Sequence, residues 1–318
     1  MSMPGAVPLL YVDRPLPVGV ADMVAGRCAF CGPAPEALRR AAGIIAGPIR
    51  WDAAGLDAAP LVRVLSRSGI GFDNVDVEAA TERGIVVCTA PEAPTVSTAE
   101  HTVALILAAA KRLVPNQLRL RAGSGDYVRA NDGIELDGRT LGLVGYGRIA
   151  RRVHRAMAAL DMTVIAHDPY VEPGGDAIEL VGFDELLARA DVISLHAPLG
   201  PATRHLVDAA AFSALRPGAV LVNAARGGLV DHDALLGALD TGQVGAAALD
   251  VTEPEPLPPD HPLLHRDDVI VTPHIASATD AGLLRLYQHA IDNALAVLAG
   301  GRPSSIVNPQ VRAGGRPA

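Results

Sequence analysis

Three side chains that can act on an organic acid follow apolar, strand-like runs in the second half of the chain. Arg226 comes after the run VLVNAA, Glu255 comes shortly after AAAL, and His274 follows VIVTP. Ligands of open parallel sheets bind at the carboxyl ends of the strands, so these side chains are predicted to lie at one edge. There Arg226 can hold a carboxylate and polarise a neighbouring oxo group. His274 can exchange a proton with that oxygen, while Glu255 holds the far ring nitrogen and sets the tautomer.

Each of these residues alone also has a structural interpretation. Arg226 could be a surface arginine, Glu255 could be one acid in the proline-rich loop EPEPLPP, and His274 could cap an element or fill a core. Their joint position at the ends of successive strands favours the catalytic interpretation.

A cofactor is indicated by the segment TLGLVGYGRIA. Residues 145–150 have the pattern G-x-G-x-x-A, placed after a strand-like run and at the head of a helix-like run. Gly145 allows the tight turn, Gly147 lets helix-terminal N–H groups approach a pyrophosphate, and Ala150 keeps the helix close to the sheet. Asp168, after the next strand-like run, can accept hydrogen bonds from both ribose hydroxyls and would repel a 2′-phosphate. The pattern favours NAD over NADP, and its alternative is a glycine-rich turn in an ordinary α/β domain.

The elements that must position these residues form two predicted α/β domains. Residues 98–285 are predicted to be the NAD-binding domain, and residues 1–97 and 286–318 a smaller substrate domain. Six strand-like runs with short connections, between residues 140 and 273, predict a doubly wound parallel Rossmann sheet.

Two long helices are predicted beside these sheets. The segment Ser97–Glu100 has a capping-box pattern and is predicted to open a linking helix that ends near Val114. A last helix, from about Thr279 to Leu298, is predicted to return the chain to the first domain.

Composition narrows the class of protein. The 318 residues are 49% hydrophobic and 19% charged, which suits two buried cores and is too apolar for disorder. The net charge of −8 argues against a nucleic-acid or anionic-membrane partner. The first residues lack the basic start and long apolar core of a signal peptide, and no run is long enough to span a bilayer. These features predict a cytoplasmic enzyme.

No metal site is predicted. Cys28 and Cys31 form a C-x-x-C pair without a second ligand pair at suitable spacing, so we expect reduced thiols there and at Cys88. His261 and His265 have i, i+4 spacing, but they follow a proline-rich stretch and lack an accompanying carboxylate motif.

Several motifs in order resemble the D-isomer-specific 2-hydroxyacid dehydrogenases. They are RSGIGFDNVD, STAEHTVALILA, LGLVGYGRIA, HAPLGPAT, VNAARGGLVD, ALDVTEPEPLP and VTPHIASAT, and they span most of the chain from residue 67 to 279. The resemblance implies a flavodoxin-like substrate domain built from both chain ends and a homodimer joined through the helix near Glu100. It also implies hydride transfer between NADH and a 2-oxo acid, as in phosphoglycerate dehydrogenases and glyoxylate or hydroxypyruvate reductases.

The same resemblance, with the strand-end positions, completes the predicted site. Arg226, Glu255 and His274 form the catalytic set. The substrate is expected at Arg226, His274 and the backbone of Ser68, Gly69, Ile70 and Gly71, with its carboxylate at Arg226 and at that backbone. The predicted cofactor-binding residues are Gly145, Tyr146, Gly147, Arg148, Ile149, Asp168, His196, Ala197, Pro198, Thr203, Ala224, Ala225, Asp250 and Ala276.

Alternatives remain at the level of sequence. A non-catalytic NAD(H)-sensing protein of the corepressor type would keep similar site residues. Formate dehydrogenases have a similar fold but pair the histidine with glutamine, and Glu255 argues against them. The segment Thr89–Pro94 departs from the usual family turn, so no particular substrate is predicted among glyoxylate, hydroxypyruvate, 3-phosphoglycerate and larger 2-oxo acids.

Overall fold

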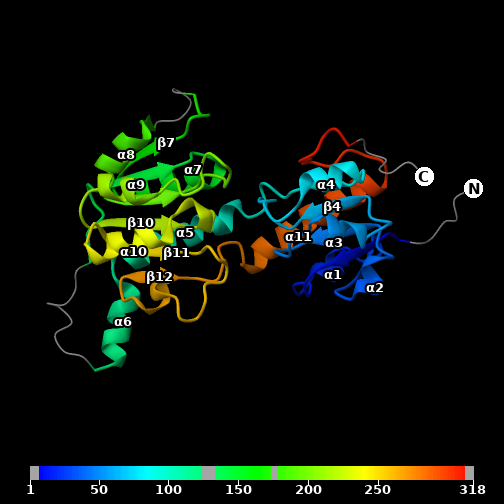
Figure 1. The fold of residues 1–318 in the computed structure, drawn as a ribbon, viewed down its shortest axis with the longest axis horizontal. Helices are drawn as coiled ribbons and strands as arrows, with labels where there is room; N and C mark the ends of the chain where they lie inside the picture. The colour runs from blue at the N-terminus through cyan, green and yellow to red at the C-terminus, as the bar shows by residue number, and fades with distance from the viewer. Residues whose placement is uncertain (1–6, 124–132, 173–177, 312–318) are drawn as a thin grey trace, which may run out of the picture. The chain divides into compact units, whose positions relative to one another are not determined.

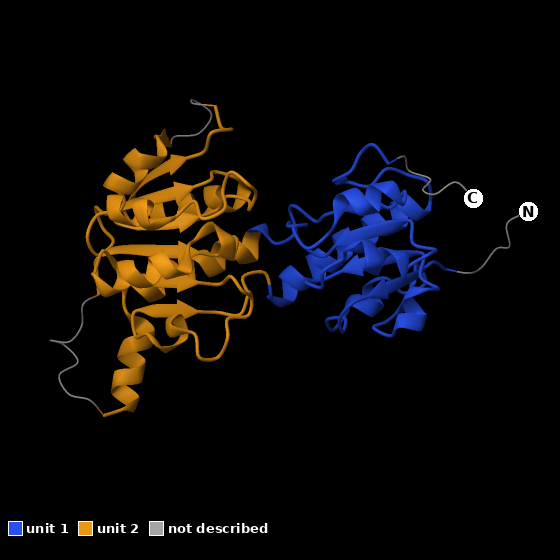
Figure 2. Cartoon of the chain, viewed as in Figure 1, with its two compact units in different colours: residues 1–95, 278–318 blue, residues 96–277 orange. Residues whose placement is uncertain are grey.

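Figure 1 shows the computed structural model, which describes residues 7–123, 133–172 and 178–311. Its contacts divide the chain into two units: unit 1 is Met1–Thr95 with Ala278–Ala318, and unit 2 is Val96–Ser277 (Figure 2). Each unit is built on a parallel β-sheet with helices, so the predicted fold class is confirmed. The second division falls at Ser277, whereas the sequence predicted it between residues 285 and 286.

The described residues of unit 1 form five parallel strands in the order β2-β1-β3-β4-β5, which is the flavodoxin-like order. Alternate residues of each strand face opposite cores: Tyr11 and Ile44 pack with helices α2 to α4, while Leu10 and Ile45 pack with α1 and α11. The strands are therefore apolar on both faces, as expected for a covered parallel sheet. The elements of unit 1 are β1 Leu9–Val12, α1 Val20–Met23, β2 Ala29–Cys31, α2 Pro35–Leu38, β3 Gly43–Ala46, α3 Ala53–Asp57, β4 Val64–Arg67, α4 Val77–Glu82, β5 Val86–Cys88 and α11 Asp280–Leu298.

Helix α11 belongs wholly to unit 1. Thr279 is its N-cap and accepts a hydrogen bond from the backbone N of Gly282, as the predicted start requires. Its buried residues recur at helical spacing and pack against β3, β4 and β5; they include Tyr287, Ala290, Ile291, Ala294 and Val297. A boundary near residue 285 would cut this apolar stripe, which explains why the division lies before the helix.

The described residues of unit 2 form seven parallel strands in the order β12-β11-β10-β9-β6-β7-β8. The order reverses between β6 and β9, which is the arrangement of a doubly wound Rossmann sheet with one added strand. The sequence predicted six strands. The missed strand, β8, has two residues, which pair with Ile165 and Ala166 of β7, so it is too short to show a periodic pattern. The strands of unit 2 are β6 Thr140–Val144, β7 Thr163–His167, β8 Glu179–Leu180, β9 Val192–Leu195, β10 Ala219–Asn223, β11 Val244–Leu249 and β12 Val269–Val271.

Helices cover both faces of this second sheet. One core packs α8, α9 and α10 on the strands, and the other packs α5 and α7 on the opposite face. The helices are α5 Thr95–Ala110, α6 Leu113–Arg121, α7 Arg148–Ala158, α8 Phe183–Arg189, α9 Ala209–Ala214 and α10 His232–Asp240, with 3-10 turns η1 Gly227–Leu229 and η2 Pro262–His265.

The predicted linking helix is corrected at both ends. It begins at Thr95, and Ser97 and Thr98 lie buried inside its first turns, so the predicted capping box does not open it. Packing therefore sets its start. It ends at Ala110 because Arg112 adopts φ of 53°, and the chain continues as the separate helix α6.

Candidate active site

The dinucleotide loop connects β6 to α7 where the strand order reverses. Gly145 has φ of 91°, and a Cβ there would lie 2.9 Å from both the backbone N of Ala197 and the carbonyl carbon of His196. Only glycine lets this turn pass so close to the loop that follows β9. Gly147 is the N-cap of α7, and apart from Gly147 and its two chain neighbours no described residue has an atom within 4 Å of where its Cβ would be. The helix N-terminus thus has room for a pyrophosphate.

Asp168 lies directly after β7 and is held by the same loop. Its Oδ2 accepts a hydrogen bond from the backbone N of Tyr146 at 2.8 Å, and its Oδ1 accepts one from the backbone N of Tyr170 at 2.9 Å. A carboxylate has about four acceptor positions, so two remain for ribose hydroxyls. The position and remaining capacity of Asp168 fit an NAD ribose.

His196 and the residues after it form the loop that follows β9. The His196 Nε2 lies 3.0 Å from the Oγ of Ser194, and burial lowers the pKa of His196 to about 4, so the ring is neutral at pH 7. Thr203 Oγ1 accepts from the backbone N of Gly200 and donates to the carbonyl of Pro198. These bonds fold the loop back on itself beside Gly145.

Arg226 lies in the loop after β10. The buried side chain of Asn223 organises that loop, donating to the carbonyl of Arg226 at 2.8 Å and accepting from the backbone N of Ala225 at 3.0 Å. The next residue, Gly227, must be glycine, because a Cβ there would lie 2.1 Å from the carbonyl group of Thr252. The Arg226 loop therefore packs directly on the loop that leads to Glu255.

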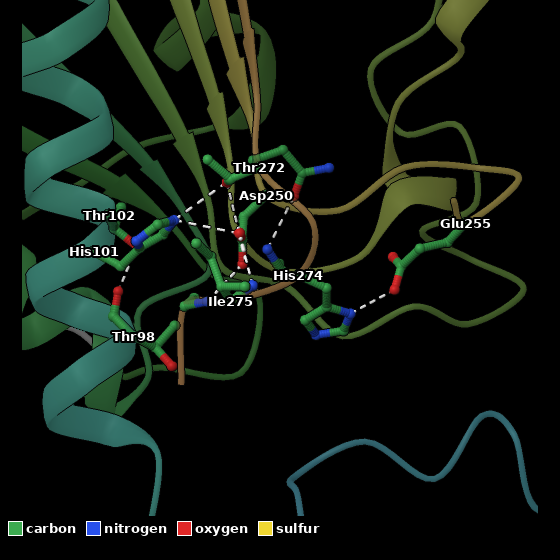
Figure 3. A network of polar contacts seen from close by, with 11 residues as sticks. Thr98, His101, Thr102, Asp250, Glu255, Thr272, His274 and Ile275 are labelled. Carbon is green, nitrogen blue, oxygen red and sulfur yellow. Dashed lines mark hydrogen bonds and ion pairs between the residues drawn. The ribbon is translucent and has the colours of Figure 1, made fainter. Parts of the chain in front are cut away.

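Glu255 and His274 form a close pair. Their side chains point toward one another in Figure 3, and His274 Nδ1 lies 2.6 Å from Glu255 Oε1. Both side chains are more than one third exposed. The backbone N of Thr252 also approaches Glu255 Oε2 at 3.4 Å. With Nδ1–H donating to the carboxylate, Nε2 of His274 is left for a reacting group.

A bidentate ion pair holds the Glu255 loop in place. Arg204 contacts the two carboxylate oxygens of Glu253 at 3.0 and 2.9 Å. The Arg204 guanidinium lowers the pKa of Glu253 below its usual value, against a smaller opposing effect of burial. This pair connects the loop after β9 to the loop after β11, and the sequence analysis missed it because neither residue directly follows a strand.

Asp250 is the most heavily hydrogen-bonded group of this edge. Its side chain accepts from Thr272 Oγ1 at 2.6 Å and from the backbone N of Ile275 and Ala276 at 2.9 and 2.8 Å. His101 Nε2, on α5, lies 3.2 Å from Asp250 Oδ1. Burial raises the pKa of Asp250, but these donors together outweigh burial and leave the pKa below its ordinary value. His101 was not among the predicted site residues, although it lies in the motif STAEHTVALILA.

The structure gathers most predicted residues of unit 2 at one edge of its sheet. Arg226, Glu255 and His274 follow three neighbouring strands, β10, β11 and β12. Glu255 and His274 are in direct contact, whereas Arg226 Nη1 donates to the carbonyl of Ala225 at 2.7 Å. The predicted cofactor residues follow the same edge: Arg148 and Ile149 open α7, Ala224 and Ala225 follow β10, and the N–H of Ala276 is bonded to Asp250.

The predicted substrate loop lies after β4 in unit 1. The backbone N and the Oγ of Ser68 both donate to the carbonyl of Ala46, and Arg67 Nε donates to the carbonyl of Gly71 at 2.9 Å. The carbonyl of Gly69 accepts from the backbone N of Ala90 at 2.8 Å. These bonds hold the loop at the carboxyl edge of the five-stranded sheet.

The described parts of the chain contain neither a candidate metal site nor a membrane-spanning helix. Within residues 7–123, 133–172 and 178–311, no group of three His, Cys, Asp or Glu side chains is placed to hold a metal ion. Cys28, Cys31 and Cys88 are free, and burial raises the pKa of Cys88 to about 12. No helix in those ranges combines the length and apolar character needed to cross a bilayer.

Comparison with known proteins identifies the middle of the chain. Residues 103–276 match the family model of the D-isomer specific 2-hydroxyacid dehydrogenase, NAD binding domain. A D-3-phosphoglycerate dehydrogenase of Archaeoglobus fulgidus is 44% identical over 239 residues, which are 74% of this chain and 45% of that protein. The chain thus spans about half the length of several such relatives.

Other similar proteins match over more of their length. A glyoxylate reductase of Thermofilum pendens is 40% identical over 271 residues, covering 82% of this chain and 79% of that protein. The crystal structure of the TT0316 protein from Thermus thermophilus superposes with a TM-score of 0.85 at 39% identity, over 94% of this chain and 99% of that one. The predicted cofactor, NAD, is confirmed by the matching NAD binding domain.

Proposed function

Because the chain belongs to the D-isomer specific 2-hydroxyacid dehydrogenase family, we propose that it interconverts a 2-oxo acid and a D-2-hydroxy acid with NAD(H). The observation that carries this proposal is the Glu255–His274 contact of 2.6 Å at the carboxyl edge of the Rossmann sheet. A carboxylate that orients one ring nitrogen of a histidine leaves the other nitrogen to act as an acid or base.

The residues divide the chemistry among them. When bound, the nicotinamide supplies the hydride for reduction and accepts it in oxidation. Arg226 holds the carboxylate of the acid and polarises its 2-oxo group. His274 gives the proton of its Nε2 to the oxygen as reduction proceeds, and takes it back when the hydroxy acid is oxidised. Glu255 stabilises the positive charge of the ring while the proton is held there.

The comparisons favour catalysis over the corepressor alternative. The similar curated proteins are named as dehydrogenases and reductases. The pairing of His274 with a glutamate also differs from the glutamine expected of a formate dehydrogenase.

The substrate class follows from the relatives and the site. The guanidinium of Arg226 suits the carboxylate of a small 2-oxo acid. Two similar proteins are named as a D-3-phosphoglycerate dehydrogenase and a glyoxylate reductase, which suggests 3-phosphoglycerate and glyoxylate as substrates. Hydroxypyruvate is chemically similar to glyoxylate. We therefore propose a substrate among glyoxylate, hydroxypyruvate and 3-phosphoglycerate or a closely similar acid.

The test follows NADH absorbance with a panel of 2-oxo acids, and NAD⁺ reduction with D-2-hydroxy acids. Wild type is expected to turn over at least one member, while Arg226→Ala and His274→Ala lower kcat/KM by about 10² to 10⁴. Matched controls are Arg216→Ala and His265→Ala, because these residues precede β10 and β12 at the opposite edge. The controls should stay within about twofold of wild type.

Either of two results would contradict the proposal. One is a folded, NADH-binding wild type that turns over no member of the panel, which would favour a sensor. The other is an Arg226 or His274 variant that is no more impaired than its control.

A homodimer in the cytoplasm completes the proposal. Helix α6 exposes apolar side chains, with Leu113 58%, Leu118 47% and Leu120 62% accessible. A second copy of the chain would cover such a surface. The three free cysteines are consistent with a reducing compartment. Light scattering of the purified protein should give twice the mass of one chain, and a monomer at micromolar concentration would count against the dimer.

A further inference from the structure

We propose that His101 is a positioning residue for His274, and that it acts through the buried carboxylate of Asp250. The inference rests on the proposed function, in which His274 carries the proton. Among the described residues, His101 forms no hydrogen bond or ion pair with Glu255, His274 or the dinucleotide loop. Figure 3 shows the arrangement, with His101 and Asp250 on one side of the His274 backbone and Glu255 on the other.

Asp250 accepts hydrogen bonds from three successive backbone amides, those of residues 274–276. Its carbonyl oxygen accepts from the backbone N of His274 at 2.8 Å, Oδ1 accepts from Ile275 at 2.9 Å, and Oδ2 accepts from Ala276 at 2.8 Å. The side chain is 1% exposed, so water does not compete for these bonds. The carboxylate thus fixes the two amides that follow His274, while the amide of His274 itself donates to the backbone carbonyls of Asp250 and Thr272.

That path is a strained one. His274 has φ of 53°, in the left-handed region that a residue with a Cβ rarely adopts. A side chain in this conformation persists only where surrounding contacts over-determine it. Here those contacts are the hydrogen bonds that Asp250 accepts from residues 274–276, the bond from the His274 amide to the Thr272 carbonyl, and the contact between the ring and Glu255.

His101 completes the donor set of Asp250. Its Nε2 lies 3.2 Å from Asp250 Oδ1 and 3.3 Å from Thr272 Oγ1. Thr272 already donates its hydroxyl hydrogen to Asp250, so both neighbours of Nε2 present lone pairs. Nε2 must therefore carry a hydrogen, and the ring donates to the carboxylate rather than accepting from the hydroxyl.

His101 is therefore connected through the Asp250 carboxylate to the backbone that follows His274. His101 lies on α5, which packs on the face of the sheet away from α8 to α10. Without this donor, the buried carboxylate would keep only Thr272 and two amides, and its ionised form would be less well stabilised. The amides of Ile275 and Ala276 would then open more often, and the ring of His274 would spend less time aligned for proton transfer.

The experiment compares His101→Ala, His101→Gln and His101→Asn in the full-length protein. Glutamine places an amide N–H at about the reach of Nε2, whereas asparagine is one methylene shorter and does not reach Asp250. The control is Thr102→Val, which removes the neighbouring hydrogen bond to the Thr98 carbonyl but leaves the Asp250 set intact.

The kinetic expectation separates positioning from folding. His101→Ala and His101→Asn should lower kcat about 10- to 100-fold while the Kd for NADH changes less than about threefold. The primary isotope effect with 4-deuterated NADH should rise, because hydride and proton transfer become slower than product release. His101→Gln should recover most of the loss, and Thr102→Val should behave as wild type.

A second measurement does not depend on turnover. Hydrogen exchange followed by mass spectrometry should show faster exchange of the peptide around residues 272–278 in the alanine and asparagine variants, and near wild-type exchange in His101→Gln. Unchanged protection there in a folded His101→Ala or His101→Asn variant would overturn the proposal. So would equal kcat values for the glutamine and asparagine variants. If wild type turns over no 2-oxo acid, the proposed function fails, and the exchange data still decide whether His101 holds this loop.

Discussion

Asp13 and Asp250 are both buried carboxylates directly after a strand of a parallel sheet, one in each unit, yet their pKa values shift in opposite directions. Burial raises the pKa of Asp13 and outweighs its few favourable contacts. Burial also raises the pKa of Asp250, but its hydrogen bonds outweigh that effect and leave the pKa lowered.

The difference lies in the number of donors. Asp13 is 6% exposed; its Oδ2 accepts from the backbone N of Gly47 at 2.7 Å, and its Oδ1 has no hydrogen-bond partner among the described residues. Asp250 is 1% exposed and receives four donors. Burial alone therefore does not decide the direction in which the pKa of a strand-end carboxylate shifts. Each donor to the ionised form offsets part of the cost of desolvation.

The largest expected effect is that of Asp250→Asn. The NH₂ group of the asparagine would face the N–H and O–H groups that now donate to Asp250, and donors cannot bond to one another. The free energy of unfolding at pH 7 should therefore fall by about 3 kcal/mol. The folded-state pKa of Asp250 is lowered, so its contribution is present above the unfolded value and is lost as the pH falls through the folded one. Urea unfolding should show a smaller difference from wild type near pH 3 than at pH 7. A loss of unfolding free energy below about 1 kcal/mol at pH 7 would show that the donors to Asp250 do not stabilise its ionised form.

Asp168 lies between these two cases, with two amide donors and two remaining acceptor positions. Asp168→Ala should relax the preference for NADH over NADPH about 10- to 100-fold, because the ribose loses its acceptor and a 2′-phosphate loses its repulsion. Ratios of kcat/KM for the two cofactors measure this. Asp161→Ala, an exposed acid after α7, is the control. An unchanged ratio in Asp168→Ala would mean that the acid does not contact the ribose.

His196 is a base whose pKa is also shifted by desolvation. Burial lowers its pKa to about 4, so the folded state resists protonation while the unfolded chain takes up a proton near pH 6.5. The contribution of His196 is therefore present above pH 6.5 and declines as the pH falls toward 4. Between pH 7 and pH 5.5 it should cost wild type about 1 kcal/mol of unfolding free energy. His196→Gln should be less sensitive to pH over this interval, and equal sensitivity would show that the ring is not desolvated.

The smallest expected effect is that of Asp13→Asn. The unfolding free energy should stay within about 1 kcal/mol of wild type at pH 7, because the ionised carboxylate has few donors to lose. The pKa of Asp13 is raised, so its favourable contribution is present below the unfolded value and is lost as the pH rises through the folded one. Relative to wild type, the variant should thus gain stability from pH 4 to pH 7, opposite to Asp250→Asn. Parallel pH trends for the two variants would show that donor number is not the cause.

Local signals were enough for much of the fold. Apolar runs, the G-x-G-x-x-A turn and the acid after the second strand predicted the Rossmann order, and α11 begins and ends as predicted. These features depend on neighbours within a few residues or on the period of a single element. The two-residue strand β8 and the buried start of α5 were missed, because tertiary packing defines both.

The site shows the same division between near and distant neighbours. Glu255 and His274 were predicted as a pair from their strand ends, and the structure brings them into contact. His101 was missed because Thr272, one of its partners, lies 171 residues further along the chain. A helical histidine shows no sequence pattern that distinguishes a donor to a buried carboxylate from a solvated side chain.

Local periodicity and residue chemistry are enough to predict the class of sheet, the cofactor loop and the set of residues that can move a proton. The tertiary structure is needed to show which carboxylates are fully supplied with donors. It also decided that the reacting histidine is held in a left-handed conformation. These properties depend on donors brought from different strands and helices into a volume without water, where each missing or added hydrogen bond counts at nearly its full strength.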